Sequence, residues 1–383
     1  MNTTFVKTKL LSAALAFLLL FVTACSSQGA QQPGASNPES EGSEASSTGG
    51  EPITLRLAHF YPVNHVLHEK GYQVFKELVE AKSNGQIKID IYPNSQLGAA
   101  YDMDKLVTDG VTDIGNITVA YFADKMPVSQ VFGLPGIYED NWVGAQAMWR
   151  SVHEGPIAEE LTKSGFVPLM IETAPLTEWF TTNKQIHNVD DITGMKIRST
   201  GGSMDQALQL AGASPVKIQL AEVYTGLERN TLDGATMNYS LATGYSIPEV
   251  TKYATEGGGL FPIGAIAASM SAEKFNELSK EQQQILYEAG KEASVTLADS
   301  FINDSLAKKE KLADAGVTLV KVSDSFMSDA KVKMQPVYDK YVSVLNERGL
   351  NGEEILQSVM ATIEEARQVS DKKVFPDYDI ITK

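Results

Sequence analysis

The most informative chemical feature of the sequence is Arg198, which ends a predicted strand and precedes a glycine-rich turn at residues 199–203. A helix pattern follows the turn, so free backbone N–H groups would lie at a helix N-terminus, a position that attracts anions. A guanidinium adds a planar set of donors that can grip a carboxylate with two charge-assisted hydrogen bonds. The pattern indicates a carboxylate site, and an arginine on the protein surface is the commoner alternative.

Three histidines, His59, His65 and His68, lie close together and could in principle share a metal ion. The only carboxylate close by is Glu69 and no cysteine is near, so the set of metal ligands is incomplete. Histidines at a strand end and a helix start more often line a cleft or cap a helix. We therefore predict no metal and no cofactor, and we keep His65 as a candidate for the wall of a ligand cleft.

The motifs of covalent and acid–base catalysis are incomplete. Residues 201–205 depart from the G-x-S-x-G nucleophile elbow at the last position. Adjacent acidic residues do not face each other across a site; such pairs are Glu159/Glu160, Asp190/Asp191 and Glu364/Glu365. Glycines 257–259 lack a phosphate-loop pattern and favour a hinge or a bulge. The sequence thus indicates a protein that is not an enzyme.

The charge balance and the cysteine content exclude further classes of function. The chain has 383 residues, with 32 lysines and arginines against 48 acidic residues, a net charge of −16. A nucleic-acid partner is therefore excluded, because phosphates require a basic surface. Cys25 is the only cysteine, which excludes disulfide frameworks, iron–sulfur clusters and cysteine-based zinc sites.

The N-terminal segment has the pattern of a bacterial lipoprotein signal. Two lysines precede the apolar run 10–22, which has the length of a signal-peptide core and is too short to span a membrane. Val-Thr-Ala-Cys at 22–25 resembles a lipobox, whose cysteine is lipidated before cleavage. We expect residues 1–24 to be removed and Cys25 to carry the lipid. An ordinary secretory signal with a cysteine there by chance is the alternative.

Residues 25–52 are predicted to be a lipidated cysteine followed by a disordered tether. The segment consists mainly of small and polar residues that cannot offset the entropy of ordering by burial. A diacylglyceryl group supplies the two chains that stable anchoring needs. We therefore expect an extracytoplasmic protein anchored to the cell membrane by lipid.

The folded region has the pattern of an α/β protein. Apolar residues alternate at strand period over 53–57 and 87–91, with a helix pattern over 67–82 between them, which predicts a βαβ unit. Further strand patterns cover 112–119, 166–172, 195–199 and 216–219, and helix patterns cover 102–108, 142–152 and 203–211. A capping box at 279–282 opens one helix of about thirty residues, long enough to bridge two domains.

Several blocks, in order, resemble the solute receptors of tripartite ATP-independent periplasmic (TRAP) transporters, the DctP-like family. The blocks are GMKIR (194–198), AGASPV (211–216), AEVYTGLE (221–228), TLDGA (231–235), NGQI (84–87), YPNSQLG (92–98), DGVTDI (109–114) and LPGIY (134–138). The resemblance covers residues 53–340 or so. It implies a clamshell of two α/β domains, with the fold of periplasmic binding proteins, joined by strands and a long bridging helix.

The resemblance also implies domain boundaries and partners. Lobe I would comprise 53–175 with part of 255–300, and lobe II 176–254 with part of 301–370, followed by a C-terminal tail at 371–383. The receptor would capture a small organic acid and deliver it to membrane permease subunits. A receptor that presents its ligand to a sensor kinase is the alternative, and an extracytoplasmic enzyme is a more distant one.

The resemblance assigns Arg198 to the arginine that pairs with the ligand carboxylate. Many acid-binding members carry a second arginine near residues 177–183, where this chain has none, so a monocarboxylate with an apolar, aromatic or aminated portion is expected. Positions 236 and 237 also depart from the family's Glu-Asn. The candidate ligand-binding residues are Arg198, Asn238, Met237, Trp179, Glu178, Tyr61, His65 and Tyr239, with Tyr245 as a further candidate for the cleft wall.

Overall fold

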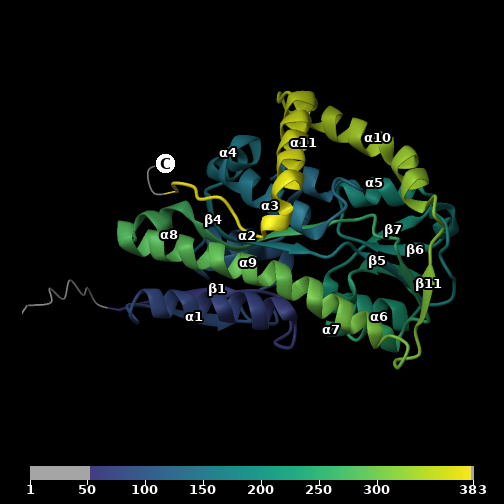
Figure 1. Ribbon diagram of the computed structural model, residues 1–383, viewed down its shortest axis with the longest axis horizontal. Helices are drawn as coiled ribbons and strands as arrows, with labels where there is room; N and C mark the ends of the chain where they lie inside the picture. The colour runs from purple at the N-terminus through teal and green to yellow at the C-terminus, as the bar shows by residue number, and fades with distance from the viewer. Residues whose placement is uncertain (1–51, 381–383) are drawn as a thin grey trace, which may run out of the picture. The chain divides into compact units, whose positions relative to one another are not determined.

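The computed structural model describes residues 52–380, which form two mixed β-sheets flanked by helices (Figure 1). The strands are β1 Ile53–Ala58, β2 Ile87–Tyr92, β3 Ile114–Ile117, β4 Phe166–Ala174, β5 Glu178–Thr181, β6 Lys196–Ser199, β7 Ser214–Lys217, β8 Gly234–Met237, β9 Tyr253–Glu256, β10 Ile263–Ser271 and β11 Thr318–Lys321. The helices are α1 Gln73–Lys82, α2 Met103–Thr108, α3 Asn141–His153, α4 Gly155–Lys163, α5 Ser203–Leu210, α6 Val223–Glu228, α7 Tyr239–Gly244, α8 Ala272–Asn276, α9 Lys280–Glu310, α10 Phe326–Glu347 and α11 Gly352–Val369.

The first sheet has five strands in the order β2-β1-β3-β10-β4. Strand β1 pairs in parallel with β2 and β3, while β10 pairs antiparallel with β3 and β4. The predicted βαβ unit is confirmed, since α1 connects β1 to β2. The helix predicted over 67–82 differs at its start, where Leu67–Tyr72 forms a π-helical turn before α1.

The second sheet has six strands in the order β11-β9-β5-β8-β6-β7. The chain enters it from β4 to β5 and returns from β9 to β10, so two crossings join the sheets. The crossings are tied together, because the Thr177 backbone N–H and hydroxyl both donate to the Phe261 carbonyl. The strand predicted over 216–219 lies two residues earlier, at Ser214–Lys217.

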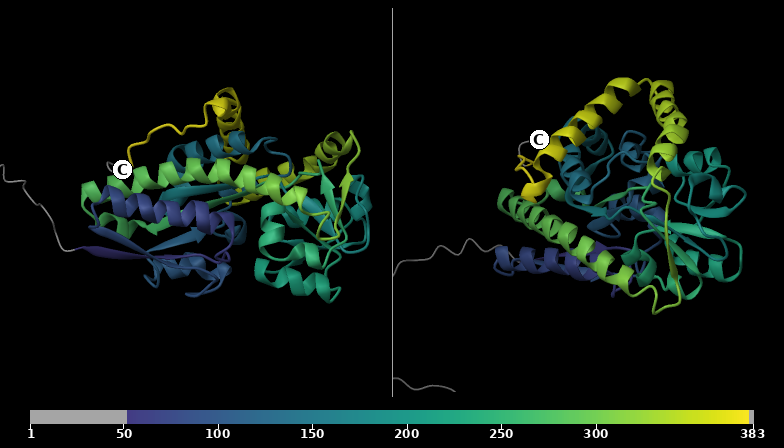
Figure 2. Two further views of the ribbon diagram at one scale, coloured as in Figure 1. Left: turned by 60° about the horizontal axis from the view of Figure 1, so that its bottom comes forward. Right: turned by 45° about the vertical axis from the view of Figure 1, so that its right-hand side comes forward.

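Helix α9 connects the two sheets a third time. It has 31 residues and opens with the predicted capping box, in which the Ser279 hydroxyl accepts from the Gln282 N–H. Helix α9 packs on β4 and α1 beside the first sheet and on α7 beside the second, and both views in Figure 2 show it passing the two sheets. A two-sheet α/β fold with one long bridging helix is therefore confirmed.

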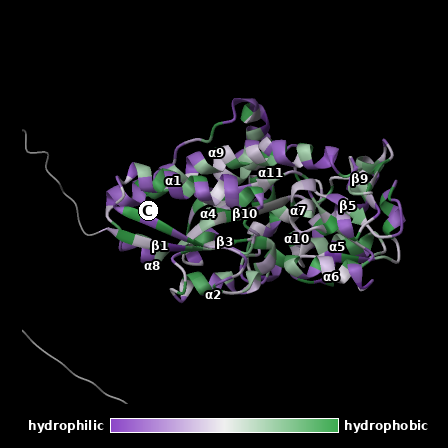
Figure 3. Ribbon diagram, turned by 90° about the horizontal axis from the view of Figure 1, so that it is seen from below, coloured by the Kyte–Doolittle hydropathy of each residue, from purple (hydrophilic) through white to green (hydrophobic). Residues whose placement is uncertain are grey.

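The outer helices carry both polar and apolar residues. Polar and apolar residues alternate around the outer helices in Figure 3, as expected for helices with one face on a sheet. The segment after α11, predicted as a C-terminal tail, also packs on the core as far as residue 380. Phe375 stacks on Trp149 with ring centroids 5.1 Å apart, and Trp149 Nε1 donates to the Pro376 carbonyl.

Within residues 52–380, no helix combines the length and the apolar character that crossing a bilayer requires. The predicted signal peptide, Cys25 and the tether up to residue 51 lie outside the described residues.

Candidate functional site

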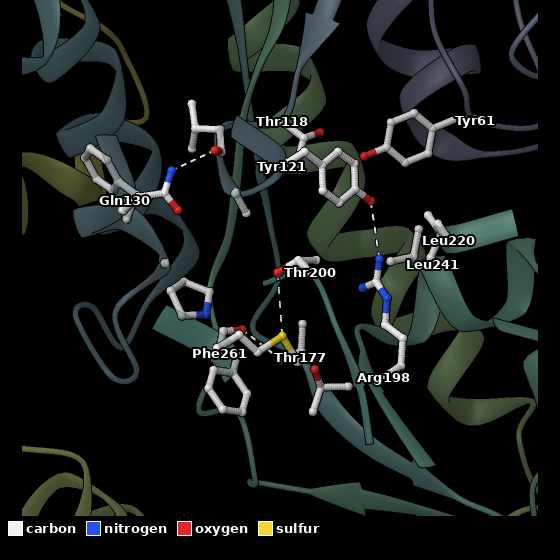
Figure 4. Close-up of a pocket in the computed structure, with 17 residues that line it drawn as sticks. Tyr61, Thr118, Tyr121, Gln130, Thr177, Arg198, Thr200, Leu220, Leu241 and Phe261 are labelled. Atoms are coloured by element: carbon white, nitrogen blue, oxygen red, sulfur yellow. Dashed lines mark hydrogen bonds between the residues drawn. The ribbon is translucent and has the colours of Figure 1, made fainter. Parts of the chain in front are cut away.

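A cavity lies between the two sheets, next to the carboxyl ends of β1 and β3 of one sheet and of β6 and β8 of the other (Figure 4). The ends of parallel strands are the usual binding position in open α/β sheets. The volume open to the centres of water molecules is about 70 Å³, and one water needs about 10–15 Å³, so a small organic molecule is the expected occupant. Its wall is formed by Tyr61, Thr118, Val119, Ala120, Tyr121, Gln130, Phe132, Gly133, Thr177, Arg198, Thr200, Met204, Leu220, Thr236, Leu241, Phe261 and Pro262.

Arg198 is placed at this cavity by β6 and is only 3% exposed. Its Nη2 donates to the Tyr121 hydroxyl over 3.3 Å, and its Nε has no hydrogen-bond partner. No acidic residue in the described part of the chain forms an ion pair with it. A buried cation without a counter-ion is costly, so Arg198 is the strongest candidate among the wall residues for pairing with an anion.

The glycine-rich turn predicted after Arg198 is present and opens helix α5. Gly201 and Gly202 have φ of +96° and +59°, a region that favours glycine, and the Gly201 N–H donates to the Ser199 hydroxyl. Thr200 and Met204, on either side of the helix start, belong to the cavity wall. The positive end of α5 therefore lies beside Arg198 and adds to its attraction for an anion.

Tyr61, a candidate wall residue in the sequence, lies in the cavity wall on the side of the first sheet. Its hydroxyl donates to both carboxylate oxygens of Glu172, at 3.1 and 3.2 Å. Glu172 is 1% exposed, and burial raises its pKa to about 7, against hydrogen bonds from Tyr61 and Asn116 that lower it. Glu172 is not itself a wall residue but contacts one, Tyr61, and no sequence motif indicated it.

Glu178 and Trp179, predicted at the ligand, lie outside the cavity wall. The Glu178 carboxylate accepts from the N–H groups of Gly257 and Gly258, at 3.1 and 2.9 Å, and from the Thr255 hydroxyl at 2.6 Å. Trp179 is 1% exposed and donates to the Gly258 carbonyl. The glycines predicted as a hinge or bulge thus hold Glu178, and both residues fasten the crossing from β9 to β10.

Met237, Asn238 and Tyr239 are also outside the cavity wall, although their neighbour Thr236 belongs to it. Met237 is buried in β8. The Asn238 side chain caps α7 by accepting from the Leu241 N–H at 2.8 Å. The Tyr239 hydroxyl donates to a backbone carbonyl of β9 at 2.6 Å. These three residues support the strand end that presents Thr236.

The histidines form a buried cluster next to Tyr61. His65 stacks on Tyr61 with ring centroids 4.7 Å apart, outside the cavity wall, and His59 Nε2 lies 3.0 Å from His68 Nδ1. Burial lowers the pKa of both His59 and His65 to about 3. Between residues 52 and 380, no three His, Cys, Asp or Glu side chains are placed so that together they could hold a metal ion. The cluster supports the loop that positions Tyr61.

Sequence reasoning missed the wall residues that come from the segment after β3. Tyr121 lies in the 3₁₀ turn Val119–Phe122 that follows β3, and Gln130 lies in the 3₁₀ turn Ser129–Gly133. Gln130 is fixed, since its amide donates to the carbonyls of Val119 and Met126. The position of Tyr121 just beyond a strand of the first sheet is the one signal that could have identified it.

Comparison with known proteins assigns the fold and the family. Residues 57–344 match the family described as bacterial extracellular solute-binding protein, family 7. The uncharacterized protein YiiZ of Salmonella typhimurium is 30% identical over 76% of this chain and 87% of its own. The family match contains every residue of the cavity wall and all strands except the first residues of β1.

Two solved structures of TRAP solute-binding proteins have the same fold. A marine metagenome protein specific for aromatic acid ligands, in complex with 3-hydroxybenzoate, gives a TM-score of 0.77 at 24% identity, covering 83% of this chain and 99% of the other. A protein from Roseobacter denitrificans with bound β-D-glucuronate gives 0.72 at 22% identity, covering 81% and 99%. The chain therefore belongs to family 7 of the bacterial extracellular solute-binding proteins, the DctP family, whose members bind solutes and are not enzymes, and it shares the fold of solved TRAP solute-binding proteins.

Proposed function

We propose that this receptor captures a small monocarboxylate with an aromatic or otherwise apolar body and delivers it to the permease of its transporter. The observation that carries the proposal is Arg198, a buried guanidinium that faces the cavity without a counter-ion among the described residues. A ligand carboxylate would satisfy Nε and Nη with charge-assisted hydrogen bonds. Tyr121 supports the same group from the other sheet.

The charges of the cavity wall favour a ligand with one carboxylate over a ligand with two. Arg198 is the single cationic side chain among the wall residues that the structure describes. A second carboxylate on the ligand would be desolvated without a partner, which is strongly unfavourable. The wall also supports an apolar body, through Phe132, Phe261 and Leu241.

The polar side chains of the wall are largely committed to protein acceptors. The Thr118 hydroxyl donates to Asn116, the Thr177 hydroxyl to the Phe261 carbonyl and the Gln130 amide to two backbone carbonyls. A sugar acid with a hydroxyl on every carbon would therefore find few free donors. An aromatic or apolar acid is the better fit, as in the protein that binds 3-hydroxybenzoate.

Delivery would depend on ligand contacts with both lobes, for which we keep the boundaries inferred from the sequence. A ligand that bridges Arg198 of the second sheet and the Tyr61 side of the first favours the closed state, because only differential affinity shifts a conformational population. We infer that Cys25 anchors the receptor near the permease and that the tether gives it reach.

Isothermal titration of acids into the purified protein tests the proposal. Paired aromatic and aliphatic monocarboxylates, a dicarboxylate and glucuronate would be titrated into wild type, Arg198→Met and the control Arg229→Met, which removes an exposed arginine. We expect monocarboxylates to bind best and Arg198→Met to weaken them by about 100-fold or more. Tight binding in Arg198→Met, or a preference for the dicarboxylate, would overturn the proposal.

A further inference from the structure

The two tyrosine hydroxyls of the cavity wall have opposite hydrogen-bonding polarity. The Tyr121 oxygen accepts from Arg198 Nη2 at 3.3 Å, and its proton has no acceptor among the residues described. While Glu172 is ionised, above its pKa of about 7, the Tyr61 proton is committed to it, at 3.1 and 3.2 Å, so only the Tyr61 oxygen lone pairs remain for the cavity. In that state Tyr121 can donate to a ligand, and Tyr61 can only accept from one.

Glu172 fixes the polarity of Tyr61. It is 1% exposed and forms no ion pair within residues 52–380, so it depends on neutral donors. One donor is Tyr61, and the other is Asn116, which is held by the Thr118 hydroxyl at 2.9 Å and itself donates to Tyr72 at 2.8 Å. The bond to a buried carboxylate also makes the Tyr61 oxygen a stronger acceptor, because linked hydrogen bonds polarise one another.

We propose that Tyr61, held by Glu172, is a specificity-determining residue that accepts a hydrogen bond from the ligand, so that the receptor selects carboxylates bearing a hydroxyl or amino group on the body of the molecule. The inference rests on the proposed function, in which Arg198 and Tyr121 hold the carboxylate. Figure 4 shows the Tyr61 hydroxyl directed toward Tyr121 and the interior of the cavity.

The alternative is that Glu172 and Tyr61 only stabilise the loop after β1. Such a role would affect all ligands alike, whereas an acceptor in the cavity distinguishes ligands by a single donor group. A ligand without this donor would leave the Tyr61 oxygen desolvated and unpaired, which is a recognised source of discrimination.

The test compares matched ligand pairs. The ligands are benzoate, 3- and 4-hydroxybenzoate and 3- and 4-aminobenzoate, with pentanoate and 5-hydroxypentanoate as an aliphatic pair. They would be titrated into wild type, Tyr61→Phe and Glu172→Gln at about pH 8, where Glu172 is mostly ionised. The control Tyr338→Phe removes a hydroxyl that donates to the Pro135 carbonyl. We expect at least one donor-bearing acid to bind wild type about tenfold more tightly than its parent. Tyr61→Phe should lose that advantage and should bind the parent acid at least as tightly as wild type does, because the oxygen that the parent leaves unpaired is gone.

The outcomes separate the two proposals. If acids bind through Arg198 but Tyr61→Phe weakens both members of each pair equally, or no donor-bearing acid is preferred, the inference is wrong and the proposed function stands. If none of these acids binds, or binding survives Arg198→Met, the proposed function fails as well. Glu172→Gln keeps the side-chain volume and should reduce the advantage of the donor. If donor-bearing acids keep their full advantage over the parent acids in Glu172→Gln, Glu172 does not fix the polarity of Tyr61.

Discussion

Arg198 and Tyr121 are joined by a hydrogen bond of 3.3 Å between Nη2 and the phenolic oxygen, across 77 residues of sequence. Within the described chain this is the single hydrogen bond that the buried guanidinium makes. It connects the end of β6 to the segment that follows β3, so each sheet contributes one group to the same end of the cavity. A carboxylate at this place would contact both sheets at once.

The first prediction concerns the stability of the ligand-free protein. Replacing Arg198 by Met removes a buried charge that has no counter-ion in the described structure, so we expect the free energy of unfolding to stay the same or to rise by about 1 kcal/mol. Urea unfolding without ligand measures this difference. A loss of more than about 2 kcal/mol would show that Arg198 has a structural partner.

The second prediction concerns pH. Burial raises the pKa of Glu172 and Glu178 from 4.5 to about 7, so the folded chain keeps two protons that the unfolded chain has lost, and stability falls as pH rises through that window. Burial lowers the pKa of His59 and His65 from 6.5 to about 3, so their contribution rises with pH. Between about pH 4.5 and 6.5 the two effects oppose each other.

Removing the titration of Glu172 should therefore make the opposite effect of the histidines on stability easier to see. In Glu172→Gln the free energy of unfolding should increase with pH more steeply than in wild type, by up to about 1.4 kcal/mol per pH unit between pH 5 and 6.5. Urea unfolding at several pH values measures both slopes. Parallel curves for the two proteins would mean that Glu172 titrates normally.

Much of the fold could be predicted because its signals are local. The capping box of α9 lies within four residues, and the βαβ unit of β1, α1 and β2 shows in short periodic patterns. The misplacement of β7 by two residues and the π-helical start before α1 depend on tertiary packing, which no short pattern records.

The site could be predicted only in part, because its contacts are long-range. Arg198 has a local motif, but Tyr121 reaches it from 77 residues away, and Glu172 reaches Tyr61 from 111 residues away. Trp179 fails to reach the cavity because β5 lies inside the second sheet and is buried throughout. A polar residue in a buried strand, such as Glu172, carries no signature in the sequence.

The third prediction concerns the packing of α9 on the first sheet. A Cβ added at Gly290 would lie 2.0 Å from the Leu169 carbonyl oxygen, a backbone atom of β4 that cannot move freely. We expect Gly290→Ala to lower the free energy of unfolding by about 3 kcal/mol or more. Thr296→Ala, at an exposed position of the same helix, should change it by less than about 0.5 kcal/mol. Equal effects of the two substitutions would contradict the packing.

The fourth prediction concerns the N-terminal segment. Cys25→Ser should abolish incorporation of a labelled fatty acid and move the receptor from the membrane fraction to the soluble extracytoplasmic fraction, because the two acyl chains supply the anchoring. Ligand affinity should not change, since the cavity residues all lie beyond residue 52. A variant that is still lipidated and membrane-bound would contradict the lipoprotein assignment.

A crystal structure of the receptor with the monocarboxylate that binds it most tightly in titration would show whether Arg198 holds the ligand. We expect the ligand carboxylate to lie about 2.7–2.9 Å from nitrogen atoms of the Arg198 guanidinium, with the Tyr121 hydroxyl donating to the same carboxylate. A carboxylate bound elsewhere, with Arg198 contacting only Tyr121, would contradict it.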